Sequence, residues 1–147
     1  MTTRQTDLRA AGRRTALLVA GDVAAMLIFA AIGRRSHGQA AGLDAIVEVT
    51  RTAAPFLLGW LVAGMLAGAY SPGRTRGLGP MLLTTLLGWI GGLVLGVVFR
   101  AILIGRFSPL SFYVVTFLVA LLLLGGWRAA FARVERWQAG YSRGQIR

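Results

Sequence analysis

The stretch TALLVAGDVAAMLIFAAI, residues 15–32, decides the fold class, because seventeen of its eighteen residues carry no charge. As an α-helix these residues span roughly 27 Å, which is close to the ~30 Å hydrocarbon core of a bilayer. Three further long apolar runs follow along the chain. We therefore expect an all-α integral membrane protein with four transmembrane helices, at about residues 15–32, 53–70, 80–104 and 109–128.

The composition supports a membrane protein. Of the 147 residues, 56% are hydrophobic and only 14% are charged, whereas roughly a quarter of an ordinary soluble domain is charged. The formal net charge is +11. Because the basic residues form short runs between apolar stretches, this charge favours contact with anionic lipid headgroups over binding of nucleic acid. The chain has no cysteine, which excludes disulfides, thiolate metal sites and cysteine nucleophiles.

Polar segments flank and separate the spans. Residues 43–52 have the pattern of a short amphipathic helix before the second span, since Asp44, Glu48 and Arg51 share one helical face. The C-terminal segment also has an amphipathic pattern, of the kind that lies on a membrane surface. The expected organisation is a cytoplasmic basic tail (residues 1–14), a four-helix transmembrane domain (residues 15–130) and a basic amphipathic cytoplasmic tail (residues 131–147).

The distribution of arginine predicts the orientation in the membrane. All 16 basic residues are arginine, and eleven of them lie in or beside the two tails and the second connection, residues 71–79. The positive-inside rule then places both termini in the cytoplasm. We expect a multi-pass protein of the plasma (inner) membrane. The GRRSHG loop, residues 33–38, falls on the outer side, where its two arginines weaken the asymmetry.

Asp22 is the most informative polar residue, because a carboxylate inside a span costs about 2.5 to 3.5 kcal/mol on insertion scales. Two interpretations stay open: an ion, proton or substrate site, or a structural contact such as a salt bridge. Asp22 lies roughly 10 Å below the cytoplasmic boundary, whereas Arg100 lies roughly 30 Å along its own helix from that side. Depth therefore predicts that Asp22 contacts Arg128, or else Thr84 and Thr85, rather than Arg100.

A second polar group is expected on the outer side. The guanidinium, hydroxyl and imidazole groups of the GRRSHG loop could together bind phosphate or carboxylate. On the same side Asp44, Glu48 and His37 are available as partners of Arg100. The alternative is a solvated turn whose arginines reach the headgroups. One histidine makes no metal site, and neither a metal nor a cofactor is expected. The candidate external anion site consists of Arg34, Arg35, Ser36, His37 and Arg100.

Glycines at four-residue spacing let helices approach one another closely. The third span carries three of them and the second span carries a similar pair. Packing within the chain and a homo-oligomer are both open at this point. The candidate packing residues are Gly88, Gly92, Gly96, Gly64 and Gly68.

The chain resembles the bacterial and archaeal membrane proteins grouped as domain of unknown function family 3054 over about residues 15–130. The resemblance implies a small four-helix prokaryotic membrane protein, and it implies no activity. The residues that carry it are Asp22, Phe29, the GRRSHG loop, Arg100, Ser111-Phe112 and Gly126-Trp127-Arg128. Within these segments the family-like positions are Asp22, Arg34, His37, Arg100, Trp127 and Arg128.

Three functions are compatible with this sequence. The first is binding or transport of a small anion or proton-coupled solute, which for transport needs a homo-oligomer because four helices are few. The second is an accessory or structural subunit that packs with partner helices and anionic lipids. The third, an enzyme acting on lipid, ranks lowest because no nucleophile or metal set is present.

Overall fold

The computed structural model describes residues 2–36 and 43–144, and within them the only regular elements are four long helices. Each helix contains a segment long and apolar enough to cross a membrane, so the prediction of an all-helical chain with four spans is confirmed. The helices are α1 (Thr2–Ser36), α2 (Leu43–Leu66), α3 (Leu78–Ile104) and α4 (Leu110–Gly144).

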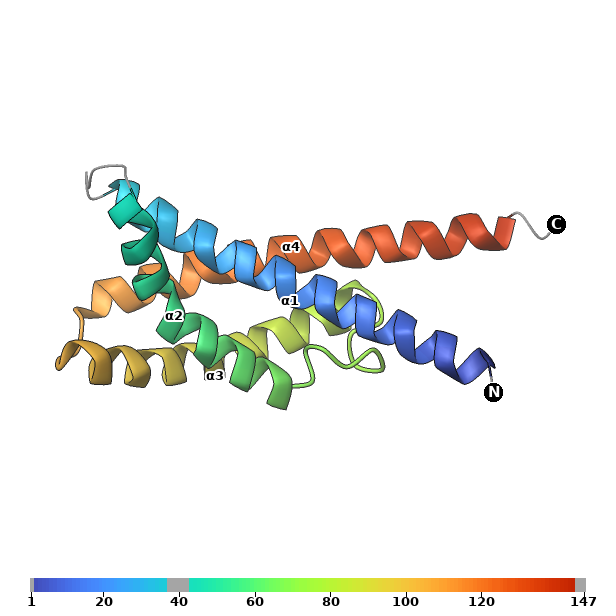
Figure 1. Ribbon diagram of the computed structural model, residues 1–147, viewed down its shortest axis with the longest axis horizontal. Coiled ribbons are helices and arrows are strands. Elements are labelled where there is room, and N and C mark those ends of the chain that lie inside the picture. Colours follow the sequence, from blue (N-terminus) through green and yellow to red (C-terminus); the bar gives the residue numbers. More distant parts are fainter. Residues whose placement is uncertain (1, 37–42, 145–147) are drawn as a thin grey trace.

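The helices pack as a ring in which α1 contacts α2 and α4, and α3 contacts α2 and α4. Figure 1 shows both chain ends, together with the α2–α3 connection, at one end of the bundle. We call this the termini end. The α3–α4 turn lies at the other end, which we call the turn end. That the termini end faces the cytoplasm stays a prediction.

Three helices extend beyond the predicted spans because flanking polar segments continue them. The N-terminal tail belongs to α1, and the C-terminal tail continues α4 as far as Gly144. Likewise residues 43–52 and the second span form one helix, so Pro55 lies inside α2 and not in a first turn. An internal proline is tolerated in a membrane helix because neighbouring groups compensate for the missing hydrogen bond.

The prediction that the second span runs to residue 70 was wrong. Helix α2 ends at Leu66, and the following turn contains Gly68 with a left-handed φ of 78°. Glycine is the residue that most readily ends a helix in this conformation. Gly68 is therefore a turn residue and not part of a helix-packing face. Helix α3 ends in the same way, at Gly105 with a φ of 69°.

The glycines of α3 pack against α2 of the same chain. A Cβ atom on Gly92 would lie 2.9 Å from Trp60 Cα, and one on Gly96 would lie 3.0 Å from Phe56 Cα. Gly59 of α2, which the sequence analysis did not single out, faces the same seam: a Cβ there would lie 2.8 Å from the Gly96 nitrogen. The four-residue glycine spacing thus brings the two backbones together within one molecule.

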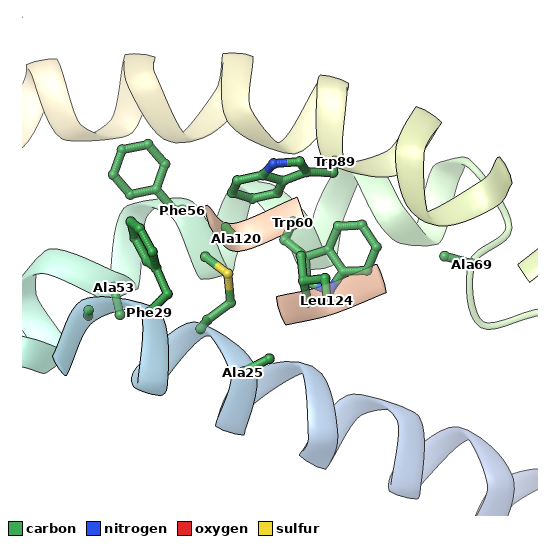
Figure 2. Packing of buried hydrophobic residues seen from close by; sticks show 11 residues of the cluster. Ala25, Phe29, Ala53, Phe56, Trp60, Ala69, Trp89, Ala120 and Leu124 are labelled. Carbon is green, nitrogen blue, oxygen red and sulfur yellow. The ribbon is translucent and has the colours of Figure 1, made fainter. Parts of the chain in front are cut away.

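Large side chains fill the interior between these close-packed helices. Figure 2 shows Phe29, Phe56, Trp60 and Trp89 pointing into one cluster, with Leu124 beside them. The Trp89 indole N–H donates to the Phe117 carbonyl at 3.0 Å, so its polar atom has a partner. This core surrounds the buried polar residues described next.

Candidate functional site

Asp22 of α1 and Arg128 of α4 form a buried ion pair. Both side chains have 0% exposed surface. The Arg128 Nη2 atom donates to Asp22 Oδ2 at 2.6 Å and Nε donates to Oδ1 at 3.0 Å. This two-pronged contact is the strong geometry for an arginine and a carboxylate. Arg128 is one of the partners that depth predicted for Asp22.

Two aromatic residues complete the hydrogen bonding of Asp22. Trp60 Nε1 donates to Asp22 Oδ2 at 3.0 Å, and the Tyr70 hydroxyl donates to the same atom at 2.7 Å. Their rings also lie 4.9 Å and 5.0 Å from the Arg128 guanidinium carbon. The carboxylate therefore accepts four hydrogen bonds, and the cation lies against two aromatic rings that stabilise it.

The pair also holds the segment between α2 and α3. The Arg128 Nη1 atom donates to the carbonyl of Ala69 at 2.8 Å. Tyr70, which follows the end of α2, belongs to the same segment. Burial raises the pKa of its hydroxyl above the usual range and the neighbouring Asp22 carboxylate raises it further, so Tyr70 stays a hydrogen-bond donor. One ion pair thus connects α1, α2, α4 and the α2–α3 connection.

The alternative prediction, that Asp22 contacts the threonines of α3, was wrong. The Thr84 hydroxyl donates to the Pro80 carbonyl at 3.0 Å, and the Thr85 hydroxyl donates to the Met81 carbonyl at 2.7 Å. A threonine inside a helix commonly satisfies its hydroxyl in this way. Both threonines are buried, but they bind their own helix.

A second charge cluster lies two helical turns away, at the termini end. The Arg14 Nε atom donates to Glu135 Oε1 at 2.6 Å, and Nη2 donates to Oε2 at 3.0 Å. Arg14 Nη1 also donates to the Thr75 hydroxyl at 3.0 Å. The Arg14 and Glu135 side chains are 14% and 35% exposed, so this pair joins α1, α4 and the α2–α3 connection at the surface.

Beside this cluster lies a cavity of about 790 Å³, which we call the basic hollow. It is bounded by α1, α4 and the segment before α3. The charged residues among its described lining are Arg14, Arg76, Glu135 and Arg136, which together carry a formal net charge of +2. Arg76 and Arg136 are exposed, and neither forms an ion pair with Asp22, Glu48 or Glu135, the acidic residues whose side chains the structure describes. The hollow therefore carries two cations that an anion can reach.

The predicted external group is brought together only in part. Arg100 Nε donates to the Ser108 hydroxyl at 3.2 Å, and its guanidinium lies 4.7 Å from the centre of the Phe112 ring. It shares a cavity of about 230 Å³ with Glu48 and Arg51, but Glu48 pairs with Arg51 at 3.9 Å. Arg100 therefore contacts the α3–α4 turn, and Glu48, one of its expected partners, pairs with Arg51 instead.

The remaining external candidates have side chains that lie outside what the structure describes. Residues 34–36 form the last turn of α1, and His37 lies outside the described residues, as do the side chains of Arg34, Arg35, Ser36 and Asp44. The anion-binding role of this loop stays a prediction.

A family comparison now gives this arrangement a context. The sequence model of a family described as a protein of unknown function (DUF3054) matches residues 19–131, well over half of the chain. The chain belongs to the DUF3054 family. The resemblance seen in the sequence is thereby confirmed, while its individual motifs stay untested. No curated protein and no solved structure matches the chain.

The DUF3054 match covers the buried pair and only part of the basic hollow. Asp22 and Arg128 lie inside the matched residues, whereas Arg14, Glu135 and Arg136 lie outside them. The Arg14–Glu135 contact could not be predicted, because nothing along the chain indicates which tail residues meet. Trp60 and Tyr70 could not be predicted as hydrogen-bond donors to Asp22 for the same reason.

Proposed function

We propose that this DUF3054 protein is a multi-pass protein of the plasma membrane that binds a phosphate-bearing anion in the basic hollow, on the cytoplasmic side. The observation that carries the proposal is the pair of exposed arginines, Arg76 and Arg136, which line one cavity and form no ion pair with any acidic side chain that the structure describes. Guanidinium groups bind phosphate oxygens through paired hydrogen bonds.

The surroundings of the two arginines also suit a binding site. Glu135 and Thr75 hold Arg14 in one orientation, so a third guanidinium is preorganised at the wall of the hollow. Preorganisation lowers the entropy lost on binding. Glu135 is already hydrogen-bonded to Arg14, which reduces its repulsion of an incoming anion.

Binding is a better proposal than transport through the bundle. Asp22 and Arg128 have no exposed surface and are fully engaged with each other and with Trp60 and Tyr70. A solute that moved past them would first have to break these contacts. The glycines of α3 are likewise occupied by α2, so an oligomeric transporter would have to assemble through other surfaces.

A binding titration with three proteins tests the proposal. The wild type, the Arg76→Gln/Arg136→Gln variant and the control Arg133→Gln are purified in a neutral detergent. Arg133 is an exposed arginine of the same helix that does not line the hollow. Thermal unfolding is then followed with added glycerol 3-phosphate or phosphatidylglycerol, against sodium chloride at equal ionic strength.

We expect a ligand at ten times its Kd to stabilise the wild type and the control by about 1.4 kcal/mol, and the double variant to show no shift. An equal shift in all three proteins would contradict the proposal, as would a shift that sodium chloride reproduces.

A further inference from the structure

The basic hollow continues along α4 toward an apolar groove. This groove has a volume of about 560 Å³ and lies between α3 and α4. On α4 its lining residues Gly125 and Ala129 are followed, at spacings of three or four residues, by Ala132 and Arg136 of the hollow. Residues at this spacing share one face of a helix. The cationic hollow and the apolar groove are therefore two parts of one α4 surface.

The basic hollow and the apolar groove lie at the depths of a phospholipid headgroup and of its acyl chains. Glu135 pairs with Arg14, which directly precedes the first apolar run, so Arg136 lies at the level expected for headgroups. Gly125, in the middle of the groove, is eleven residues away, or about 16 Å along the helix. That distance is comparable with half of the ~30 Å hydrocarbon core.

The groove exists because α4 carries small residues where it faces α3. A Cβ on Gly126 would meet no atom within 4 Å, and one on Gly125 would touch only Leu82, at 3.9 Å. Leucine side chains form most of the remaining lining, including Leu86 and Leu122. A surface of this kind has room for a hydrocarbon chain and no charged group to repel it.

We propose that the anion is the phosphate of a membrane phospholipid, with its headgroup in the basic hollow and an acyl chain in the groove between α3 and α4. This inference rests on the proposed function and names the ligand for it. The phosphate is opposite in charge to the arginines of the hollow, and the acyl chain and the groove are both apolar. The distance between the hollow and the groove is close to the thickness of one leaflet.

The test compares ligands with and without acyl chains. Binding of phosphatidylglycerol, phosphatidylcholine and glycerol 3-phosphate to the wild type is measured by native mass spectrometry and by thermal unfolding in neutral detergent. The variant Gly126→Leu places a side chain in the groove at a position where an added Cβ meets no atom within 4 Å. Gly140→Leu is its matched control, because Gly140 is also open on α4 but lies beyond both cavities.

The lipid proposal predicts that phosphatidylglycerol binds more tightly than zwitterionic phosphatidylcholine, whose choline cation the arginines of the hollow repel. It also predicts that phosphatidylglycerol binds at least about tenfold more tightly than glycerol 3-phosphate, since burial of a few methylene groups alone gives that factor. Gly126→Leu should lose most of this advantage and keep the glycerol 3-phosphate affinity. Gly140→Leu should bind like the wild type. Leu122→Trp, which fills the groove from an exposed position, replaces Gly126→Leu if that variant does not fold.

Two other outcomes separate the proposals. If glycerol 3-phosphate binds as tightly as the lipid, or if filling the groove changes nothing, the ligand is a soluble anion; the lipid inference then fails while the proposed function stands. If the Arg76→Gln/Arg136→Gln variant binds every ligand like the wild type, the proposed function fails and the lipid inference fails with it.

Discussion

The two charge clusters that join α1 to α4 differ in their access to solvent. The inner pair, Asp22 with Arg128, has no exposed surface and accepts further hydrogen bonds from aromatic donors. The outer pair, Arg14 with Glu135, is partly exposed and borders the basic hollow. Two arginine–carboxylate pairs on the same two helices therefore have different roles: the inner pair is a structural contact, and the outer pair forms one wall of the proposed binding surface.

The two pairs also have opposite polarity. On α1 the outer residue is the cation Arg14 and the inner residue is the anion Asp22, whereas on α4 the order is reversed, with Glu135 outside and Arg128 inside. A shift of α1 by two turns would bring Asp22 beside Glu135, or Arg14 beside Arg128. Because like charges at low dielectric repel strongly, this alternation favours one register of the two helices.

Removal of the inner charge should have the largest effect. Asp22→Asn leaves Arg128 buried without a counter-charge, and loss of one partner from a buried pair costs about 3 to 5 kcal/mol. The free energy of unfolding is measured in mixed micelles. Asp22→Asn/Arg128→Gln, which leaves no net charge, should be more stable than the sum of the single variants implies. If the losses of the two single variants add up in the double variant, the contact between Asp22 and Arg128 does not itself contribute to stability.

A side chain added at the α2–α3 seam should have the next largest effect. Gly92→Ala places a Cβ against the Trp60 backbone, and overpacking of this kind costs about 1 to 3 kcal/mol. Gly126→Ala is the control, because it meets open space and should be neutral or stabilising by up to about 1 kcal/mol. Unfolding in mixed micelles measures both; equal stability of the two variants would disprove the close approach.

Loss of the outer pair should cost less. Arg14→Gln removes a partly exposed contact, and pairs of this type contribute about 1 kcal/mol or less. The loss should also shrink as salt is added, since exposed charges are screened. A loss as large as that of Asp22→Asn, or one independent of salt, would mean that the two pairs are equivalent.

The sequence was sufficient for the number of spans, and it limited the partner of Asp22 to a few residues. The apolar runs predicted the helices because bilayer thickness sets their length. Residue depth then limited the partners of Asp22 to Arg128 and two threonines. The choice between them could not be made from sequence, because Thr84 and Thr85 satisfy their hydroxyls within α3, and only the rotation of each helix decides which side faces Asp22.

The basic hollow could not be predicted for a related reason. Its arginines come from three segments far apart in the chain, and charge counts treat Arg14, Arg76 and Arg136 as equivalent orientation signals. The pairing of Arg14 with Glu135, which leaves the other two without that acidic partner, arises only when the tails continue as helices. Sequence patterns describe each tail as polar without indicating that the two tails meet.

The most direct test is one unfolding experiment in neutral detergent, with and without phosphatidylglycerol, on Asp22→Asn and on Arg76→Gln/Arg136→Gln. The account predicts that Asp22→Asn lowers the basal Tm strongly but retains the lipid-induced increase. The double arginine variant should keep the wild-type basal Tm and lose the increase. The opposite pattern, with the lipid effect lost on changing Asp22 and kept without the two arginines, would contradict the assignment of structure to the inner pair and binding to the hollow.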